Sequence, residues 1–192
     1  PHAEVKYSLF NDMFIPYVGA TGNVGRNSFQ SVTSDNPFVS SAIELKNTVK
    51  RYEIYGGIRG SFSSSMSFNV RVSQARFTDM PFFFNDTVYS LQNKFAVVYD
   101  NVNVLSIGGQ LGYRVDEKLK VYVRGDFYDY GLDTEAYAWH KPSLEISVGG
   151  FYNMADKLVV RADVFFIGKR FAKSLRPVNG LELTAVTSPD GQ

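Results

Sequence analysis

The feature that most constrains the fold of this sequence is an alternation of apolar and polar residues with a period of two. Residues 51–62 show it most clearly: the even positions include Tyr52 and Ile58, whereas the odd positions include Glu53 and Arg59. Successive side chains of a β-strand point to opposite faces of the sheet, so this segment predicts a strand with one apolar and one charged face. The same alternation recurs along most of the chain and predicts an all-β protein.

The alternating segments predict an antiparallel up-and-down meander of about eight long strands. The predicted strands cover residues 3–10, 13–26, 47–62, 66–77, 94–115, 118–129, 143–153 and 157–170. Residues 94–115 keep one parity across the polar stretch 100–103, so they are predicted as one strand and not as a hairpin. Residues 13–26 alternate poorly and contain Pro16, which cannot donate a hydrogen bond within a sheet.

The connections between the predicted strands alternate between short turns and long loops. Short turns are predicted at residues 11–12, 63–65, 116–117 and 155–156, and long loops at about 27–46, 77–93, 130–142 and 170–180. Transmembrane β-barrels have short turns on one side of the membrane and longer loops on the other, and their strands need about 9 to 11 residues to cross it. We therefore expect residues 1–192 to form one domain, a transmembrane β-barrel or a segment of a larger barrel.

The two parities assign each strand an outer, lipid-contacting face and an inner face. The residues expected on the outer face are Ile54, Ile58, Val70, Ile107, Leu111, Val121, Val123, Ile146, Val148, Val160 and Val164. The charged residues expected to face the lumen are Glu53, Arg59, Arg71, Arg114, Lys120, Arg124, Asp126, Glu145, Arg161 and Asp163. These charges either line an aqueous lumen and contact a plug, or form a cross-strand ladder of ion pairs that fills a narrow barrel.

The long loops are rich in aromatic residues, which are the candidates for ligand binding. They are Phe82, Phe83, Phe84, Tyr89, Tyr137 and Trp139, with His140 beside the last of them. Loops on a rigid strand scaffold are where binding residues concentrate, and an aromatic ring can stack on a ligand such as a sugar. The alternative is that these rings pack the loops against each other.

Composition excludes several other classes of protein. The 20 basic and 19 acidic residues give a net charge of +1, which argues against a nucleic-acid-binding protein. Cysteine is absent and there are two histidines, so we expect no disulfide, no metal site and no enzyme activity. Residues 19–25 match a glycine-rich dinucleotide-binding pattern, but the polar segment 26–35 does not predict the amphipathic helix that such a site requires, so no cofactor is expected.

Two weaker hypotheses concern the polar strand tips and the loops. Residues 100–103 and 85–86 supply oxygen atoms of the kind that bind calcium, although a polar strand tip is the simpler interpretation. His140 shares its loop with Asp133 and Glu135, which is the one arrangement that resembles a catalytic site. A histidine at a barrel rim more commonly packs a loop, so no catalytic residue is predicted.

Four segments resemble the barrel portion of TonB-dependent outer-membrane receptors, and the likeness covers the chain from about Tyr7 to Phe171. They are Tyr-Gly-Gly-Ile-Arg-Gly at 55–60, Asn-Pro-Phe at 36–38, Val-Tyr-Asp-Asn-Val at 98–102 and Ala-Trp-His-Lys-Pro at 138–142. The resemblance implies a cell outer-membrane protein for nutrient uptake, with a barrel of about 22 strands embedded in outer-membrane lipid. It also implies a plug domain, the TonB system and a nutrient ligand as partners. The chain shows neither a plug nor a TonB box.

The alternative is a soluble or surface-exposed β-sandwich or barrel that binds a partner without transport. Two observations argue against it. The polar face is rich in Arg, Ser, Gly and Tyr rather than in mixed Lys and Glu, and the predicted strands exceed the usual length of about 5 to 6 residues.

Overall fold

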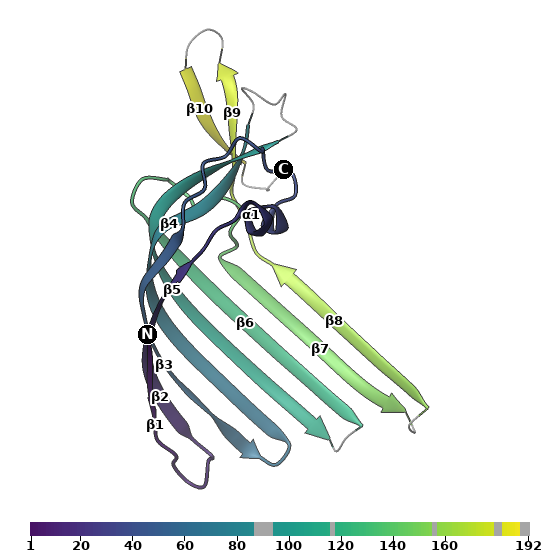
Figure 1. Ribbon diagram of the computed structural model, residues 1–192. Coiled ribbons are helices and arrows are strands. Elements are labelled where there is room, and N and C mark those ends of the chain that lie inside the picture. Colours follow the sequence, from purple (N-terminus) through teal and green to yellow (C-terminus); the bar gives the residue numbers. More distant parts are fainter. Residues whose placement is uncertain (87–93, 116–117, 155–156, 179–181, 189–192) are drawn as a thin grey trace.

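The predicted meander is confirmed by a computed structural model, which describes all residues except 87–93, 116–117, 155–156, 179–181 and 189–192. The elements are β1 (His2–Lys6), β2 (Ile15–Gly25), α1 (Phe29–Asp35), β3 (Thr48–Ser63), β4 (Met66–Asn85), β5 (Phe95–Val115), β6 (Leu119–Leu132), β7 (Leu144–Met154), β8 (Leu158–Ile167), β9 (Ala172–Val178) and β10 (Glu182–Ser188). Strands β1 to β8 pair antiparallel in sequence order in one sheet, as Figure 1 shows. No helix among the described residues is long and apolar enough to cross a membrane.

The eight-strand sheet is open. Of the described strands, β1 pairs with β2 alone and β8 with β7 alone, so the two lie at opposite edges of the sheet (Figure 1). The chain then leaves the meander. Strands β9 and β10 form an antiparallel hairpin that joins the sheet through a single parallel pair between Ser174 and Asn85 of β4.

The predicted strands 3–10 and 157–170 were too long, because β1 ends at Lys6 and β8 at Ile167. Two other predicted strands were too short, because they continue into the expected loops. The predicted loop 77–93 is strand as far as Asn85, and β6 continues to Leu132. Between Phe77 and Met80 the register shifts at a β-bulge, where Asp79 has a left-handed φ of 54°. A bulge adds a residue to one strand, so it inverts the apolar parity and hides the continuation from a period-two search. We call residues 78–85 and 95–103 the β4–β5 extension.

The expected loops 27–46 and 170–180 also contain secondary structure. Helix α1 begins after a capping box in which Ser28 and Ser31 satisfy each other's backbone N–H groups, and it buries only Val32. The prediction that this segment holds no helix was therefore wrong, because a seven-residue helix with one buried position leaves no 3.6-residue pattern. The second segment contributes to β9. The predicted turns 116–117 and 155–156 lie outside the described residues.

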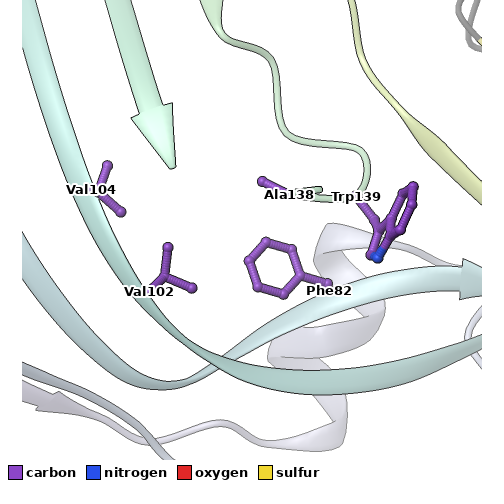
Figure 2. Packing of buried hydrophobic residues seen from close by; sticks show 5 residues of the cluster. All are labelled: Phe82, Val102, Val104, Ala138 and Trp139. Atoms are coloured by element: carbon purple, nitrogen blue, oxygen red, sulfur yellow. The ribbon is translucent and has the colours of Figure 1, made fainter. Parts of the chain in front are cut away.

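The apolar core lies around the β4–β5 extension, and both faces of the extension are covered. Its inner face packs Phe82 and Val102 against Ala138 and Trp139 of residues 133–143, which we call the Trp139 loop (Figure 2). Its outer face packs Phe83 against Val32 and Val39 of the segment that holds α1. Phe82 and Trp139 are 0% and 2% exposed, and burying a large apolar side chain stabilises the folded state by about 1.5–3 kcal/mol. The extension and its two covering segments therefore pack together as one block at one end of the sheet.

Candidate functional site

The outer face of the sheet presents an apolar surface to its surroundings. The register places Leu111, Val123, Val148 and Val164 in one row across β5 to β8, and all four are exposed, with Val123 at 43%. The predicted outer residues all lie on this face. Val121 and Ile146 are half-buried and the others are exposed. A continuous exposed apolar surface of this kind is what a lipid-facing wall requires.

Exposed aromatic rings lie at both ends of this apolar surface. Tyr52 and Phe127 mark the end nearer the extension, and Phe62, Tyr113 and Tyr152 mark the end with the short turns. Tyr52 and Phe62 both belong to β3, ten residues apart. At about 3.3 Å per residue and a tilt of about 45°, ten residues span about 23 Å, which is close to the apolar band of about 25 Å in membrane barrels.

The register places the charged residues that the sequence assigns to the lumen on the face opposite the apolar surface, and most of them have a local partner. Contact with a lumen stays a prediction. The Glu53 carboxylate pairs with Arg71 of the neighbouring strand and with Lys50, both at 2.7 Å. The Arg71 guanidinium also lies 3.9 Å from the ring centroid of Tyr55. The Arg59 guanidinium lies over the ring of Tyr17 at 5.4 Å. These contacts hold the side chains of β2 to β4 in place on this face.

The other ion pairs among the predicted inner charges follow single strands and do not form a ladder across the sheet. Arg124 pairs with Asp126 at 2.6 Å along β6, and Arg161 pairs with Asp163 at 3.1 Å along β8. Arg114 and Glu145 make no ion pair within the part of the chain that the structure describes. Of the predicted inner charges, Glu53 and Arg71 supply the one pair between strands, which argues against a ladder that fills a narrow barrel.

Several inner side chains lie flat along the sheet because glycines leave room for them. A Cβ at Gly149 would lie 2.2 Å from the Tyr122 ring, whose hydroxyl donates to Asp163 at 2.7 Å. A Cβ at Gly108 would lie 2.7 Å from a carboxylate oxygen of Asp126. An open groove of about 400 Å³ remains on this face, lined by Glu53, Asn69, Arg71, Ser73, Ser106, Gly108, Gly109, Gln110, Arg124, Asp126 and Tyr128.

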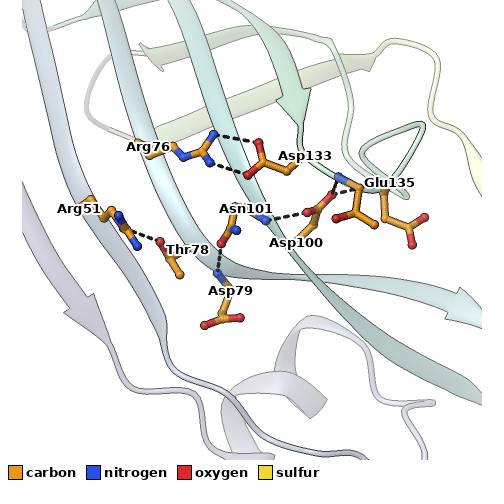
Figure 3. A network of polar contacts seen from close by, with 9 residues as sticks. Arg51, Arg76, Thr78, Asp79, Asp100, Asn101, Asp133 and Glu135 are labelled. Atoms are coloured by element: carbon orange, nitrogen blue, oxygen red, sulfur yellow. Dashed lines mark hydrogen bonds and ion pairs between the residues drawn. The ribbon is translucent and has the colours of Figure 1, made fainter.

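A polar network holds the Trp139 loop against the extension and against Arg76 of β4 (Figure 3). The Asp100 carboxylate accepts the backbone N–H of Glu135 at 2.7 Å and that of Thr134 at 2.9 Å. Asp133 pairs with Arg76 at 2.5 Å. Asp100 lies beyond the exposed apolar part of β5. Burial alone would raise its pKa, but the backbone N–H groups of Glu135, Thr134 and Asn101 outweigh burial and hold the pKa of Asp100 below its ordinary value.

A second set of polar contacts ties the same loop to β9. Glu135 accepts the indole N–H of Trp139 at 2.7 Å and pairs with Lys173 at 2.8 Å. The Lys173 ammonium also lies 5.7 Å from the ring centroids of Phe84 and Trp139. Sequence reasoning missed Asp100, Arg76 and Lys173 as loop anchors, because a single charge at a strand tip does not reveal its distant partner.

The predicted ligand-binding aromatics occupy different environments. Phe82, Phe83 and Trp139 are buried in the cores described above, so their present contacts are loop packing. Tyr137 is 38% exposed and stacks on Phe171 at 4.3 Å. Phe84 is half-buried near the Lys173 ammonium, and Tyr89 lies outside the described residues. Binding by these rings stays a prediction, and Tyr137 is the best presented of those described.

His140 occupies a strained and half-buried position at the end of the Trp139 loop. Its φ is 61°, and its backbone N–H donates to the Phe171 carbonyl at 2.8 Å. The ring packs edge-on against Phe95 at 5.8 Å. Burial, with a smaller effect from Arg170, lowers the pKa of His140. These contacts describe a packing role.

Other hypotheses from the sequence can also be placed in the fold. The glycine-rich residues 19–25 lie within β2, paired with β3, and not at the start of a helix. Both carboxylate oxygens of Asp100 accept hydrogen bonds from backbone N–H groups. No cluster of three His, Cys, Asp or Glu residues suited to a metal is found among the described residues.

Together these features define an antiparallel barrel segment with one apolar, exposed face and one charged face. No protein-family model and no curated protein matches the chain. One similar solved structure is that of the FpvAI–pyocin S2 complex, with a TM-score of 0.57 and 14% identity over 90% of this chain. Another is the copper transporter OprC, with a TM-score of 0.58 and 12% identity over 90% of this chain. The chain spans 22% and 26% of those two chains, and the similarity concerns the fold alone.

Proposed function

We propose that this chain is part of the wall of an outer-membrane β-barrel receptor that takes up a nutrient, of the TonB-dependent type. The observation that carries the proposal is the exposed apolar face bounded by aromatic rings, opposite a face that carries the charges. The fold similarity to two much longer chains supports a segment of a larger barrel. The sequence resemblance supports the receptor type, with a plug and the TonB system as partners.

The arrangement of the loops supports an orientation in the membrane. Strands β1, β3, β5 and β7 end, and β2, β4, β6 and β8 begin, at one end of the sheet, while the extension and the Trp139 loop lie at the other (Figure 1). Barrels of this class turn their short connections to the periplasm. The extension and the Trp139 loop then face the outside, where a ligand arrives.

The proposal requires that the apolar face of the sheet contacts lipid or detergent when the chain is folded. We expect the chain, refolded in detergent, to migrate differently on SDS gels before and after boiling. The matched control is the same chain refolded in buffer without detergent, where the exposed apolar face should cause aggregation. A folded, monodisperse monomer without detergent would show that this face does not contact lipid and would favour the soluble binding module.

Uptake is tested in the full-length protein through its loops. Deleting residues 82–84 would remove part of β4, so single substitutions separate binding from folding better. We expect Tyr137→Ala, at an exposed ring, to weaken ligand binding or uptake while the barrel stays folded. Trp139→Phe keeps the buried packing and serves as the control. Unchanged uptake with Tyr137→Ala would leave this ring as loop packing only.

A further inference from the structure

A row of basic residues crosses four strands on the inner face, at the end with the short turns. The register pairs Arg114 of β5 with Lys120 of β6, Lys120 with Phe151 of β7, and Phe151 with Arg161 of β8. We call Arg114, Lys120 and Arg161 the basic row. Arg114 and Lys120 are directly opposite each other, an arrangement that destabilises a sheet unless an anion compensates it.

The described residues compensate only one end of the basic row. Arg161 pairs with Asp163 at 3.1 Å, and that carboxylate also accepts the Tyr122 hydroxyl at 2.7 Å. Arg114 and Lys120 are both exposed, and neither forms an ion pair with any residue that the structure describes. The Lys120 ammonium lies 5.5 Å from the Phe151 ring. Two cations therefore face the same space, and no carboxylate of the described residues, which leave out 116–117, lies between them.

That space is a hollow rich in hydroxyl groups. A cavity of about 340 Å³ contacts Arg114 and Lys120 and is lined by the serines at positions 61, 63, 64, 65 and 67. It exists because Gly112 has no side chain and the neighbouring Tyr122 ring lies over Gly149 on its other side. A Cβ at Gly112 would lie 2.8 Å from the Ser67 hydroxyl, so this hydroxyl occupies the space above Gly112. It lines the same hollow as Arg114 and Lys120. A second hollow of about 270 Å³ shares Lys120 and Tyr122 and reaches Arg161.

We propose that the basic row and the adjacent serine hydroxyls form a binding site for an oxyanion, a phosphate or carboxylate group. A guanidinium binds two oxyanion oxygens at once, an ammonium adds a point charge, and serine hydroxyls donate to the remaining oxygens. An oxyanion between Arg114 and Lys120 turns a repulsive pair into two attractive contacts. The site goes beyond the proposed function, which assigns no ligand to this end of the barrel.

Binding is measured by calorimetry on the full chain folded in neutral detergent at low salt. Two probes separate the sources of the oxyanion: inorganic pyrophosphate supplies phosphate, and a hexaglutamate peptide supplies carboxylates of a polypeptide. We expect at least one probe to bind, with an affinity that falls as salt is added. Arg114→Gln combined with Lys120→Gln should weaken binding at least about tenfold, because two charge-assisted hydrogen bonds are lost. Arg51→Gln, which removes one positive charge beside Thr78 and matches the single variant Lys120→Gln in charge, should leave binding unchanged.

The outcomes are distinct. Binding of pyrophosphate alone assigns phosphate, and binding of the peptide alone assigns an acidic segment; both support the site. Failure of both probes to bind, or equal binding by the double variant, overturns it. If the double variant does not fold, Lys120→Gln alone gives the same comparison. Heat-modifiable migration of the same preparation tests the barrel separately, so a chain that binds without that behaviour keeps the site and loses the proposed function.

Discussion

Arginine at Val123 tests whether the apolar face contacts lipid. Val123 lies in the middle of the exposed part of β6, four residues from Leu119 and four from Phe127, and its neighbours in the row are Leu111 and Val148. An arginine at the midplane of the lipid face of a barrel costs about 2–4 kcal/mol. At about 1.4 kcal/mol per factor of ten, Val123→Arg should lower the folding equilibrium constant by about 30-fold to about 10³-fold.

The matched control is Ser147→Arg at nearly the same depth on the inner face. Ser147 is paired with Arg124, so the new arginine meets a like charge and should cost no more than about 1 kcal/mol. Ser147→Gln has no such repulsion and should be close to neutral. The difference between Val123→Arg and Ser147→Arg is therefore at least about 1 kcal/mol.

The assay is urea unfolding of the chain in lipid vesicles, followed by far-ultraviolet circular dichroism and by the fluorescence of Trp139, the single tryptophan. Circular dichroism reports on the whole sheet, and Trp139 reports on the loop and the extension. Equal penalties for the two arginine variants, or a larger one for Ser147→Arg, would refute the assignment of lipid and lumen to the two faces.

Three further expectations follow from the described contacts. Gly149→Ala should destabilise the sheet by about 1–3 kcal/mol in the same urea assay, because its Cβ would meet the Tyr122 ring, whereas Gly125→Ala, with nothing within 4 Å of its Cβ, should not. Trp139→Ala should cost about 3–5 kcal/mol of loop stability, seen as faster proteolysis of the loop, and Trp139→Phe should cost less. Burial lowers the pKa of His140, so the loop is most stable above the ordinary histidine pKa of 6.5 and loses stability as the pH falls through the pKa of the folded state. The emission of Trp139 should report this loss of stability. His140→Gln should abolish the pH dependence.

The regular part of the fold was predictable because each strand of the meander carries its own pattern. In β6, Val121 and Val123 alternate with Tyr122 and Arg124, and the register confirms that these pairs occupy opposite faces. In a sheet with two chemically different faces, every strand must alternate between apolar and polar residues, so a single sequence is enough to detect the two faces.

The extension was not predictable, because its two faces do not differ in polarity. Beyond Phe77 both faces of β4 are covered by protein, so Phe82 and Phe83 are consecutive, apolar and both buried. A strand buried on both faces has no alternation, and the bulge before it shifts the phase. The anchors Asp100 and Lys173 depend on contacts between segments that are distant in the sequence. A pattern within one segment contains no information about such contacts.

The open edge of β8 has a consequence for handling this chain. All ten residues of β8 are exposed. They include Phe166 on the outer face and Phe165 on the inner face. A long apolar strand with an unpaired backbone edge is a template for adding another strand. At high protein concentration the isolated chain should therefore self-associate edge to edge, even in detergent, which masks apolar faces but cannot supply the missing backbone hydrogen bonds.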